Sequence, residues 1–168
     1  MGLLIKGGGH AMAAGVTLRH DRLAPFRAFL EAELAAAVEA GRRDRTLLID
    51  GAVTAAAAGP AFHAMIARAG PYGPGNPEPV FAFPSHAIAY AEEVGQAHVR
   101  VRLKSGDGSA LSAIAFRAVG QPLGEALLKN RGRAVHAAGT LALDRWQGEE
   151  RVQLRLIDVA VDDPVARV

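Results

Sequence analysis

The segment at residues 71–79 constrains the fold most, because neither a helix nor a central strand can pass through it. It contains four prolines and two glycines within nine residues. Proline lacks the backbone N–H that a helix interior or a central strand needs. The hydrophobic pattern also changes here, from a helical spacing before the segment to alternation after it. We therefore expect the clearest boundary in the chain at this segment.

The residues before this boundary have the spacing of amphipathic helices. In residues 21–40, apolar side chains recur every three or four positions, which predicts a helix with one buried stripe and Asp21 as its N-terminal cap. The stripe consists of Leu23, Phe26, Leu30, Leu34 and Val38. We also expect a short strand at residues 47–49 and a second helix at residues 60–69.

The residues after the boundary alternate as strands do. Residues 98–104 place three apolar side chains on one face and basic side chains on the other, and residues 105–108 form a hairpin turn. The other expected elements are strands at 86–94, 111–116, 134–143 and 151–161 and a helix at 121–130. A helix between the third and fourth of five strands is the order of an OB-fold, although other small barrels share much of that order.

Composition excludes several kinds of function. The chain of 168 residues has no cysteine, which excludes disulfides, thiol catalysis and cysteine-ligated metals. Its net charge is only +2, so binding to an anion needs a local arrangement of its many arginines rather than bulk charge. No apolar run approaches the ~20 residues of a membrane span. We expect a soluble cytoplasmic protein with no membrane partner.

A glycine-rich motif opens the chain. Gly7, Gly8, Gly9 and His10 follow a short apolar strand, and residues 11–15 suggest a short turn of helix. Glycine N–H groups and the positive end of a helix can bind an anion, and His10 could donate to a phosphate oxygen. The alternative is a flexible, tag-like start. The opening strand has no partner before it, so we expect the chain to be a fragment.

Basic side chains mark two of the expected barrel strands. Arg100, Arg102 and Lys104 share one face of their strand, and Arg151 and Arg155 share one face of the last strand. Because the other face lies in the core, these charges must point outward. Together with Trp146 at the neighbouring turn, they favour a surface for single-stranded nucleic acid. The alternative interpretation of each arginine is an ordinary solvated surface residue.

No motif for catalysis or metal binding occurs in the sequence. His63 has no ligand-spaced neighbour, and the acidic residues fall in adjacent pairs that suit loops. The chain contains no His-Glu-x-x-His and no nucleophile elbow. We expect no catalytic residue and no metal in this chain.

Three stretches together resemble the C-terminal part of RecJ, a family of single-strand-specific DNA exonucleases in the DHH phosphoesterase superfamily. Residues 7–15 look like the signature of the DHH-associated domain, residues 71–81 like the proline-rich entry into the OB domain, and residues 145–159 like its last hairpin. The resemblance implies an α+β chain. It comprises the C-terminal portion of an α/β DHH-associated domain (1–45), a connector helix and linker (46–79) and a five-stranded OB-fold β-barrel (80–168).

The resemblance implies 5′→3′ degradation of single-stranded DNA in recombination and repair. The full-length enzyme would use Mn²⁺ or Mg²⁺ held by a DHH domain that this chain lacks, so the chain alone is expected to be inactive. By position, Gly7 to His10 would contact the substrate phosphate while the OB domain holds the strand. A single-strand-binding protein and a repair helicase are candidate partners. The alternatives are a stand-alone OB-fold binding module and a protein-docking domain without catalysis.

Overall fold

The chain divides into two compact units, Met1–Leu47 and Leu48–Val168. A computed structural model describes residues 2–43, 46–146 and 149–161, and for residues 42, 43, 145, 146 and 149 it describes the backbone alone. Within the described residues, no helix is both long and apolar enough to cross a lipid bilayer.

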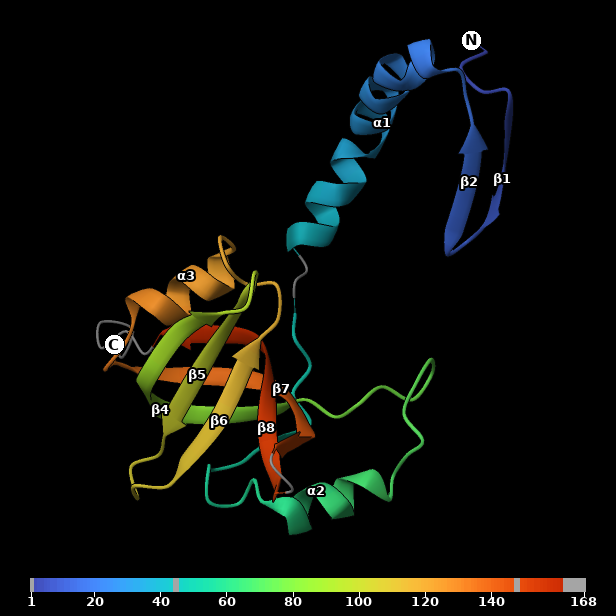
Figure 1. Ribbon diagram of the computed structural model, residues 1–168. Helices are drawn as coiled ribbons and strands as arrows, with labels where there is room; N and C mark the ends of the chain where they lie inside the picture. Colours follow the sequence, from blue (N-terminus) through green and yellow to red (C-terminus); the bar gives the residue numbers. More distant parts are fainter. Residues whose placement is uncertain (1, 44–45, 147–148, 162–168) are drawn as a thin grey trace. The chain divides into compact units, whose positions relative to one another are not determined.

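The first unit is a β-hairpin followed by a helix (Figure 1). Strands β1 (Lys6–His10) and β2 (Ala13–Thr17) pair antiparallel, with Gly8 opposite Gly15. The helical turn expected at residues 11–15 is therefore wrong. A single turn of helix is unfavourable on its own, whereas a reversal at residues 11–12 lets the glycine strand pair with the chain that follows.

Helix α1 (Leu23–Arg43) follows a short 3-10 turn, η1 (His20–Arg22). Asp21 lies inside that turn and pairs with Arg19 at 3.0 Å, so the expected capping role is wrong. The apolar stripe exists, but it is not buried as expected: Leu34 is 50% exposed. One hairpin and one helix are too few elements to cover such a stripe.

The second unit is a closed five-stranded barrel (Figure 1). Its strands are β4 (Phe81–Val94), β5 (His98–Lys104), β6 (Ala110–Ala115), β7 (Ala134–Trp146) and β8 (Glu149–Val161). Strands β4, β5 and β6 form an antiparallel meander, β8 pairs parallel with β6 and antiparallel with β7, and β7 closes the barrel on β4. With helix α3 (Pro122–Lys129) between β6 and β7, the predicted OB-fold order is confirmed.

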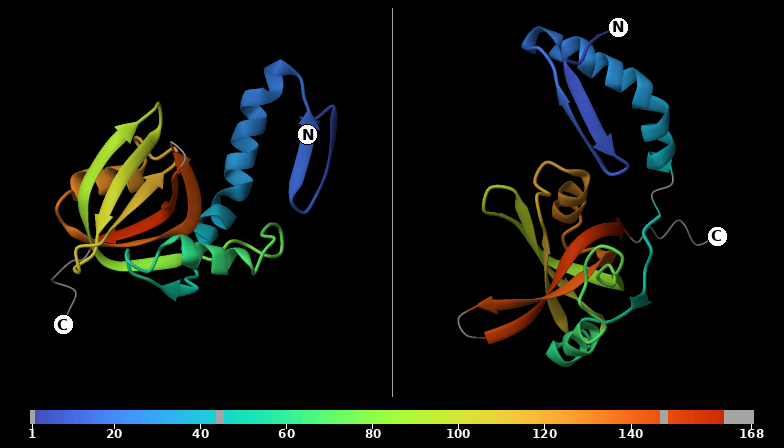
Figure 2. Two further views of the ribbon diagram at one scale, coloured as in Figure 1. Left: turned by 60° about the horizontal axis from the view of Figure 1, so that its bottom comes forward. Right: turned by 90° about the vertical axis from the view of Figure 1, so that its right-hand side faces the viewer.

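Two helices cover opposite ends of the barrel (Figure 2). Helix α3 packs against β4, β5 and β8, while α2 (Pro60–Ala67) packs against β7 and β8. Residues 48–79 thus belong to the same compact unit as the barrel. The strand expected at 47–49 is wrong: pairing starts at Asp50, whose N–H donates to Val80 O at 2.8 Å, and strand β3 is Gly51–Ala52.

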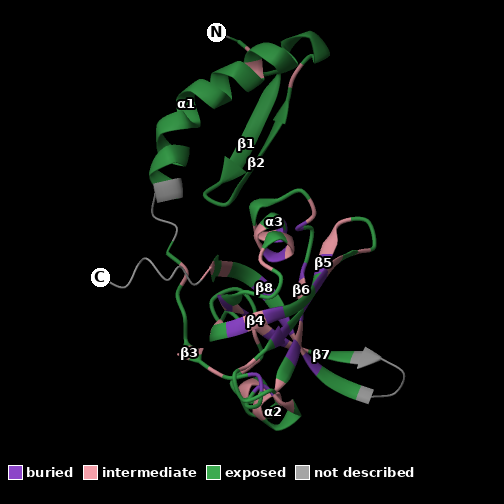
Figure 3. Cartoon of the chain, turned by 90° about the vertical axis from the view of Figure 1, so that its left-hand side faces the viewer, coloured by how far each residue is buried: buried purple, intermediate pink, exposed green. Residues whose placement is uncertain are grey.

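The core follows from the alternation in the strands (Figure 3). Val99, Val101 and Leu103 on β5 are at most 1% exposed, as the pattern predicts. Leu127 of helix α3 is buried in this core. The helix lies so close to the loop before it that a Cβ on Gly124 would be 1.9 Å from Ala118 O. Glycine is therefore required where α3 meets the barrel.

One buried polar side chain ties the barrel to the chain that precedes it. His86 on β4 is 2% exposed. Its Nε2 accepts from the N–H of Ala55 at 3.1 Å, and its Nδ1 lies 2.8 Å from Pro84 O. Both ring nitrogens have partners only if Nδ1 carries the proton and donates it. This histidine is a structural link rather than a reactive group.

Candidate nucleic-acid interface

The glycine–histidine motif, residues 7–10, forms most of strand β1 of the hairpin in the first unit. The N–H of Met12 donates to His10 Nδ1 at 3.2 Å. Because Nδ1 accepts, the proton of the neutral ring is on Nε2, which leaves an N–H donor on an exposed side chain. His10 therefore stabilises the turn and can still donate a hydrogen bond to a ligand.

The glycines of this strand differ in why they lack a side chain. A Cβ on Gly9 would lie 2.6 Å from Ala13 O, so close strand pairing requires glycine there. A Cβ on Gly8 would meet no atom within 4 Å. Packing therefore does not require glycine at position 8. The absence of a side chain there leaves the backbone open to a ligand.

The expected anion site at a helix N-terminus is wrong, because a strand rather than a helix follows the glycines. The available donors are different. Among the described strands, β1 pairs only with β2, and an antiparallel ladder uses the N–H groups of one edge at every second residue. The other N–H groups of β1 face its open edge, where a phosphate could approach.

On the barrel, the predicted basic residues of β5 gather on the outer surface. Arg100, Arg102 and Lys104 are exposed and alternate with buried neighbours. In register, Arg100 lies opposite Ile114 of β6, and Ile114 lies opposite Arg155 of β8. Because residues paired in register point to the same side of a sheet, Arg100 and Arg155 share one face about 10 Å apart. We call the outer face of β4, β5, β6 and β8 the cationic wall.

The other two predicted residues of the last hairpin lie in the same region of the chain. Arg151 is exposed, lies on β8 four residues before Arg155 and pairs in register with Asp144 of β7. Trp146 ends β7, and its side chain lies outside the described residues.

The charges on the cationic wall are unequally compensated. Arg100 Nε donates to Glu92 Oε1 at 2.9 Å, and its Nη2 donates to the same oxygen. Among the described residues, Arg102 donates its one side-chain hydrogen bond to the neutral Ser112 hydroxyl, at 3.3 Å. Neither Lys104 nor Arg155 has an acidic partner among the described residues. The positive charge available to a ligand is therefore at Arg102, Lys104 and Arg155 more than at Arg100.

Sequence reasoning missed two exposed aromatic residues on this wall. Tyr90 is 48% exposed and lies opposite Arg102, while Phe116 is 53% exposed and packs edge-to-face on His98 at 5.1 Å. A register shift between Ile88 and Tyr90 resets the alternation of β4, so the strand pattern alone did not reveal which way Tyr90 points. Phe116 follows the last residue of β6. Extending the alternation of that strand by one residue would have predicted that Phe116 points outward.

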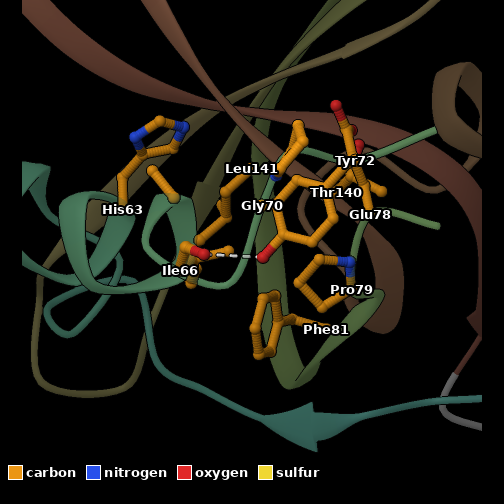
Figure 4. A pocket seen from close by; sticks show the side chains of 11 residues that line it. His63, Ile66, Gly70, Tyr72, Glu78, Pro79, Phe81, Thr140 and Leu141 are labelled. Atoms are coloured by element: carbon orange, nitrogen blue, oxygen red, sulfur yellow. Dashed lines mark hydrogen bonds between the residues drawn. The ribbon is translucent and has the colours of Figure 1, made fainter. Parts of the chain in front are cut away.

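A cavity of about 250 Å³ lies between α2, the proline-rich segment and the barrel (Figure 4). Its walls are mainly apolar, and the Tyr72 hydroxyl is held by Ile66 O at 2.6 Å. His63, Tyr72 and Glu78 are the ionisable side chains that line it. Among the described residues, no three metal-ligating side chains gather in this cavity or elsewhere.

Comparison with known proteins identifies the family. The model of the RecJ OB domain matches residues 49–158. The chain belongs to the RecJ OB domain family. Its RecJ relatives include the single-stranded-DNA-specific exonuclease RecJ of Dickeya dadantii, which is 31% identical over 156 residues, 91% of this chain and 26% of that protein. The RecJ of Escherichia coli is 28% identical over the same share of both chains.

A solved RecJ structure extends this similarity to the fold. RecJ of Thermus thermophilus in complex with Mn²⁺ is 26% identical, with a TM-score of 0.60 over 96% of this chain and 22% of that one. The chain thus spans about a quarter of the length of these relatives. The resemblance to RecJ and the OB-fold are both confirmed.

Proposed function

We propose that this chain is the substrate-binding part of a RecJ-like 5′→3′ exonuclease that acts on single-stranded DNA in recombination and repair. The observation that carries the proposal is the cationic wall on an OB-fold barrel, with Arg102, Lys104 and Arg155 free of acidic partners among the described residues. The RecJ relatives named above are single-stranded-DNA-specific exonucleases, which supports the choice of ligand.

The wall suits a phosphate backbone for two physical reasons. Guanidinium groups bind phosphate oxygens with two donors at once, and outward cations on neighbouring strands form a surface along which a strand can lie. Arg151 would extend this surface towards the last hairpin, and Trp146 is proposed as a stacking residue there. Such binding depends on backbone charge and has little sequence preference.

In the first unit we propose that Gly7, Gly8, Gly9 and His10 contact a substrate phosphate. The open edge of β1 and the N–H of His10 Nε2 support this role. We also propose the division of the chain into three functional parts, residues 1–45, 46–79 and 80–168.

The family's metal does not fit the described residues, since no group of three ligands gathers among them. We propose that Mn²⁺ or Mg²⁺ acts in the DHH domain of a full-length enzyme and that this chain binds DNA without cutting it. A single-strand-binding protein or repair helicase as partner, and a cytoplasmic location, are proposed from the resemblance to RecJ.

The salt dependence of binding tests the proposal. We expect the affinity of the chain for a labelled thymidine oligonucleotide to fall steeply as salt rises, by anisotropy. Arg102→Glu should weaken binding and reduce the slope of log K against log salt by about 0.7 for each phosphate that the variant no longer neutralises. Arg68→Glu, at an exposed position at the end of α2, makes the same charge change away from the wall and should have little effect.

Two outcomes would contradict the proposal. If Arg102→Glu and Arg68→Glu change binding equally, the wall is an ordinary solvated surface. If the purified chain degrades 5′-labelled DNA with Mn²⁺ after host nucleases are removed, it is more than a binding part.

A further inference from the structure

The cationic wall exposes aromatic rings that the core could have used. The chain has only nine aromatic residues, and β4 packs both its phenylalanines, Phe81 and Phe83, with the core. Tyr90 on the same strand and Phe116 after β6 are about half exposed. Single exposed apolar residues are ordinary, but two aromatic rings among outward cations form the pattern of surfaces that bind unpaired bases.

The Tyr90 hydroxyl lies beside the Glu92 carboxylate. That hydroxyl bonds to Glu92, which raises the pKa of Tyr90, and the same bond together with Arg100 lowers the pKa of Glu92. Arg100, Glu92 and Tyr90 thus form a chain of contacts across β4 and β5. A ring whose polar end has a neighbouring partner loses less freedom when a base stacks on it.

The Phe116 ring is also supported. It packs on His98 with the ring planes at 74°, and His98 Nδ1 accepts from the N–H of Arg117 at 2.9 Å. The imidazole is therefore anchored to the backbone, and it supports the phenyl ring from one side. The other parts of the ring account for its 53% exposure.

The two rings are spaced for one strand of nucleic acid. In register Tyr90 lies opposite Arg102, and His98 lies four residues earlier on β5. Phe116 lies beside His98 on the far side of β5. At about 3.3 Å per residue and 4.8 Å for each of the two strand spacings, the rings are roughly 16 Å apart, with Arg100 between them. This separation is shorter than the stretch of single strand, roughly 4–16 nucleotides long, that an OB-fold binds.

We propose that Tyr90 and Phe116 are two base-stacking platforms through which the cationic wall recognises the unpaired bases of single-stranded DNA. This inference rests on the proposed function of the wall, and it adds recognition of the bases to attraction of the phosphates. Arg100 and Glu92 act as positioning residues for Tyr90, whereas Arg102 and Arg155 serve the backbone.

Paired binding measurements test the platforms. The probes are a labelled thymidine 12-mer and a 12-mer of abasic sites with the same phosphates, measured by anisotropy with the full chain at low salt. The wild type should prefer the thymidine probe by roughly 5- to 150-fold for each stacked base. Tyr90→Ala and Phe116→Ala should each reduce this preference and leave affinity for the abasic probe unchanged, while Tyr90→Phe should retain most of it.

Phe29→Ala provides the matched control, since Phe29 is a half-exposed phenylalanine on α1. It should change neither affinity. The inference is overturned if Tyr90→Ala and Phe116→Ala keep the full preference for thymidine. In that case the proposed function still stands, provided that the wild type binds both probes. If neither probe binds the wild type, the proposed function itself fails, and the platforms fail with it.

Discussion

Replacing His86 by alanine should destabilise the barrel more than most single changes. The substitution leaves the buried N–H of Ala55 without its acceptor, which costs about 1–3 kcal/mol, and it removes the partner of Pro84 O, about 1 kcal/mol more. The space left by a ring that is 2% exposed adds about 1–2 kcal/mol. We expect a loss of about 3–6 kcal/mol, which in a domain of this size lowers Tm by roughly 10–25 °C.

Urea unfolding followed by circular dichroism measures this loss, and two further variants sharpen it. His86→Gln places Oε1 near the position of Nε2 and should recover part of the stability by accepting again from Ala55. His63→Ala removes a histidine side chain from the rim of the cavity. The structure gives that side chain no hydrogen bond among the described residues, so the change should cost about 0.5 kcal/mol or less. A loss under about 1 kcal/mol for His86→Ala, or an equal loss for alanine and glutamine, would refute the argument.

Single contacts lead to three further predictions. Gly124→Ala should cost about 2–3 kcal/mol in urea unfolding because its Cβ would overlap Ala118 O, whereas Gly59→Ala, with open space around it, should cost less than about 0.5 kcal/mol. In a full-length enzyme, His10→Ala should lower the rate of DNA degradation far more than Tm; a fall in Tm with a proportionate fall in rate would make His10 structural. The pKa of Glu92 is lowered in the folded state, so its contribution to stability is present above its ordinary value of 4.5 and disappears as pH falls through the lowered value. Unfolding measured from about pH 6 to pH 3 should therefore show a small acid loss that Glu92→Gln lacks, and equal pH profiles would contradict this.

The predictable parts of the fold are those where each strand has one solvent-exposed face and one buried face. Residues 98–104 alternate without interruption, and β5 occupies that range, His98–Lys104. The first barrel strand was harder, because β4 begins at Phe81 and register shifts interrupt its pairing after Phe83 and after Ile88. A shift of one residue exchanges the inward and outward faces, so a single alternating pattern cannot cover the strand.

The first unit shows a different limit. Residues 11–15 contain three alanines, which favour helix, yet residues 11–12 form a turn and residues 13–15 pair as a strand, because pairing with the glycine strand outweighs local preference. The helical spacing of α1 correctly predicted a helix, but it could not establish that the stripe is buried, since burial depends on which elements pack against it. Leu23 is 55% exposed on the helix as it stands in this unit.

The sequence predicted which basic residues of the candidate interface point outward. It could not predict which of them matter most for binding. Alternation alone makes Arg100 and Arg102 equivalent, whereas the register with β4 gives Arg100 an acidic neighbour and Arg102 an aromatic one. Arg100→Glu would therefore break an ion pair and place two carboxylates together, so any loss of binding would include a change in the wall itself. Arg102→Glu breaks one hydrogen bond with a neutral hydroxyl. Its effect on DNA affinity reports the electrostatics of the wall more directly, which is why the register, rather than the number of basic residues, identifies the informative substitution.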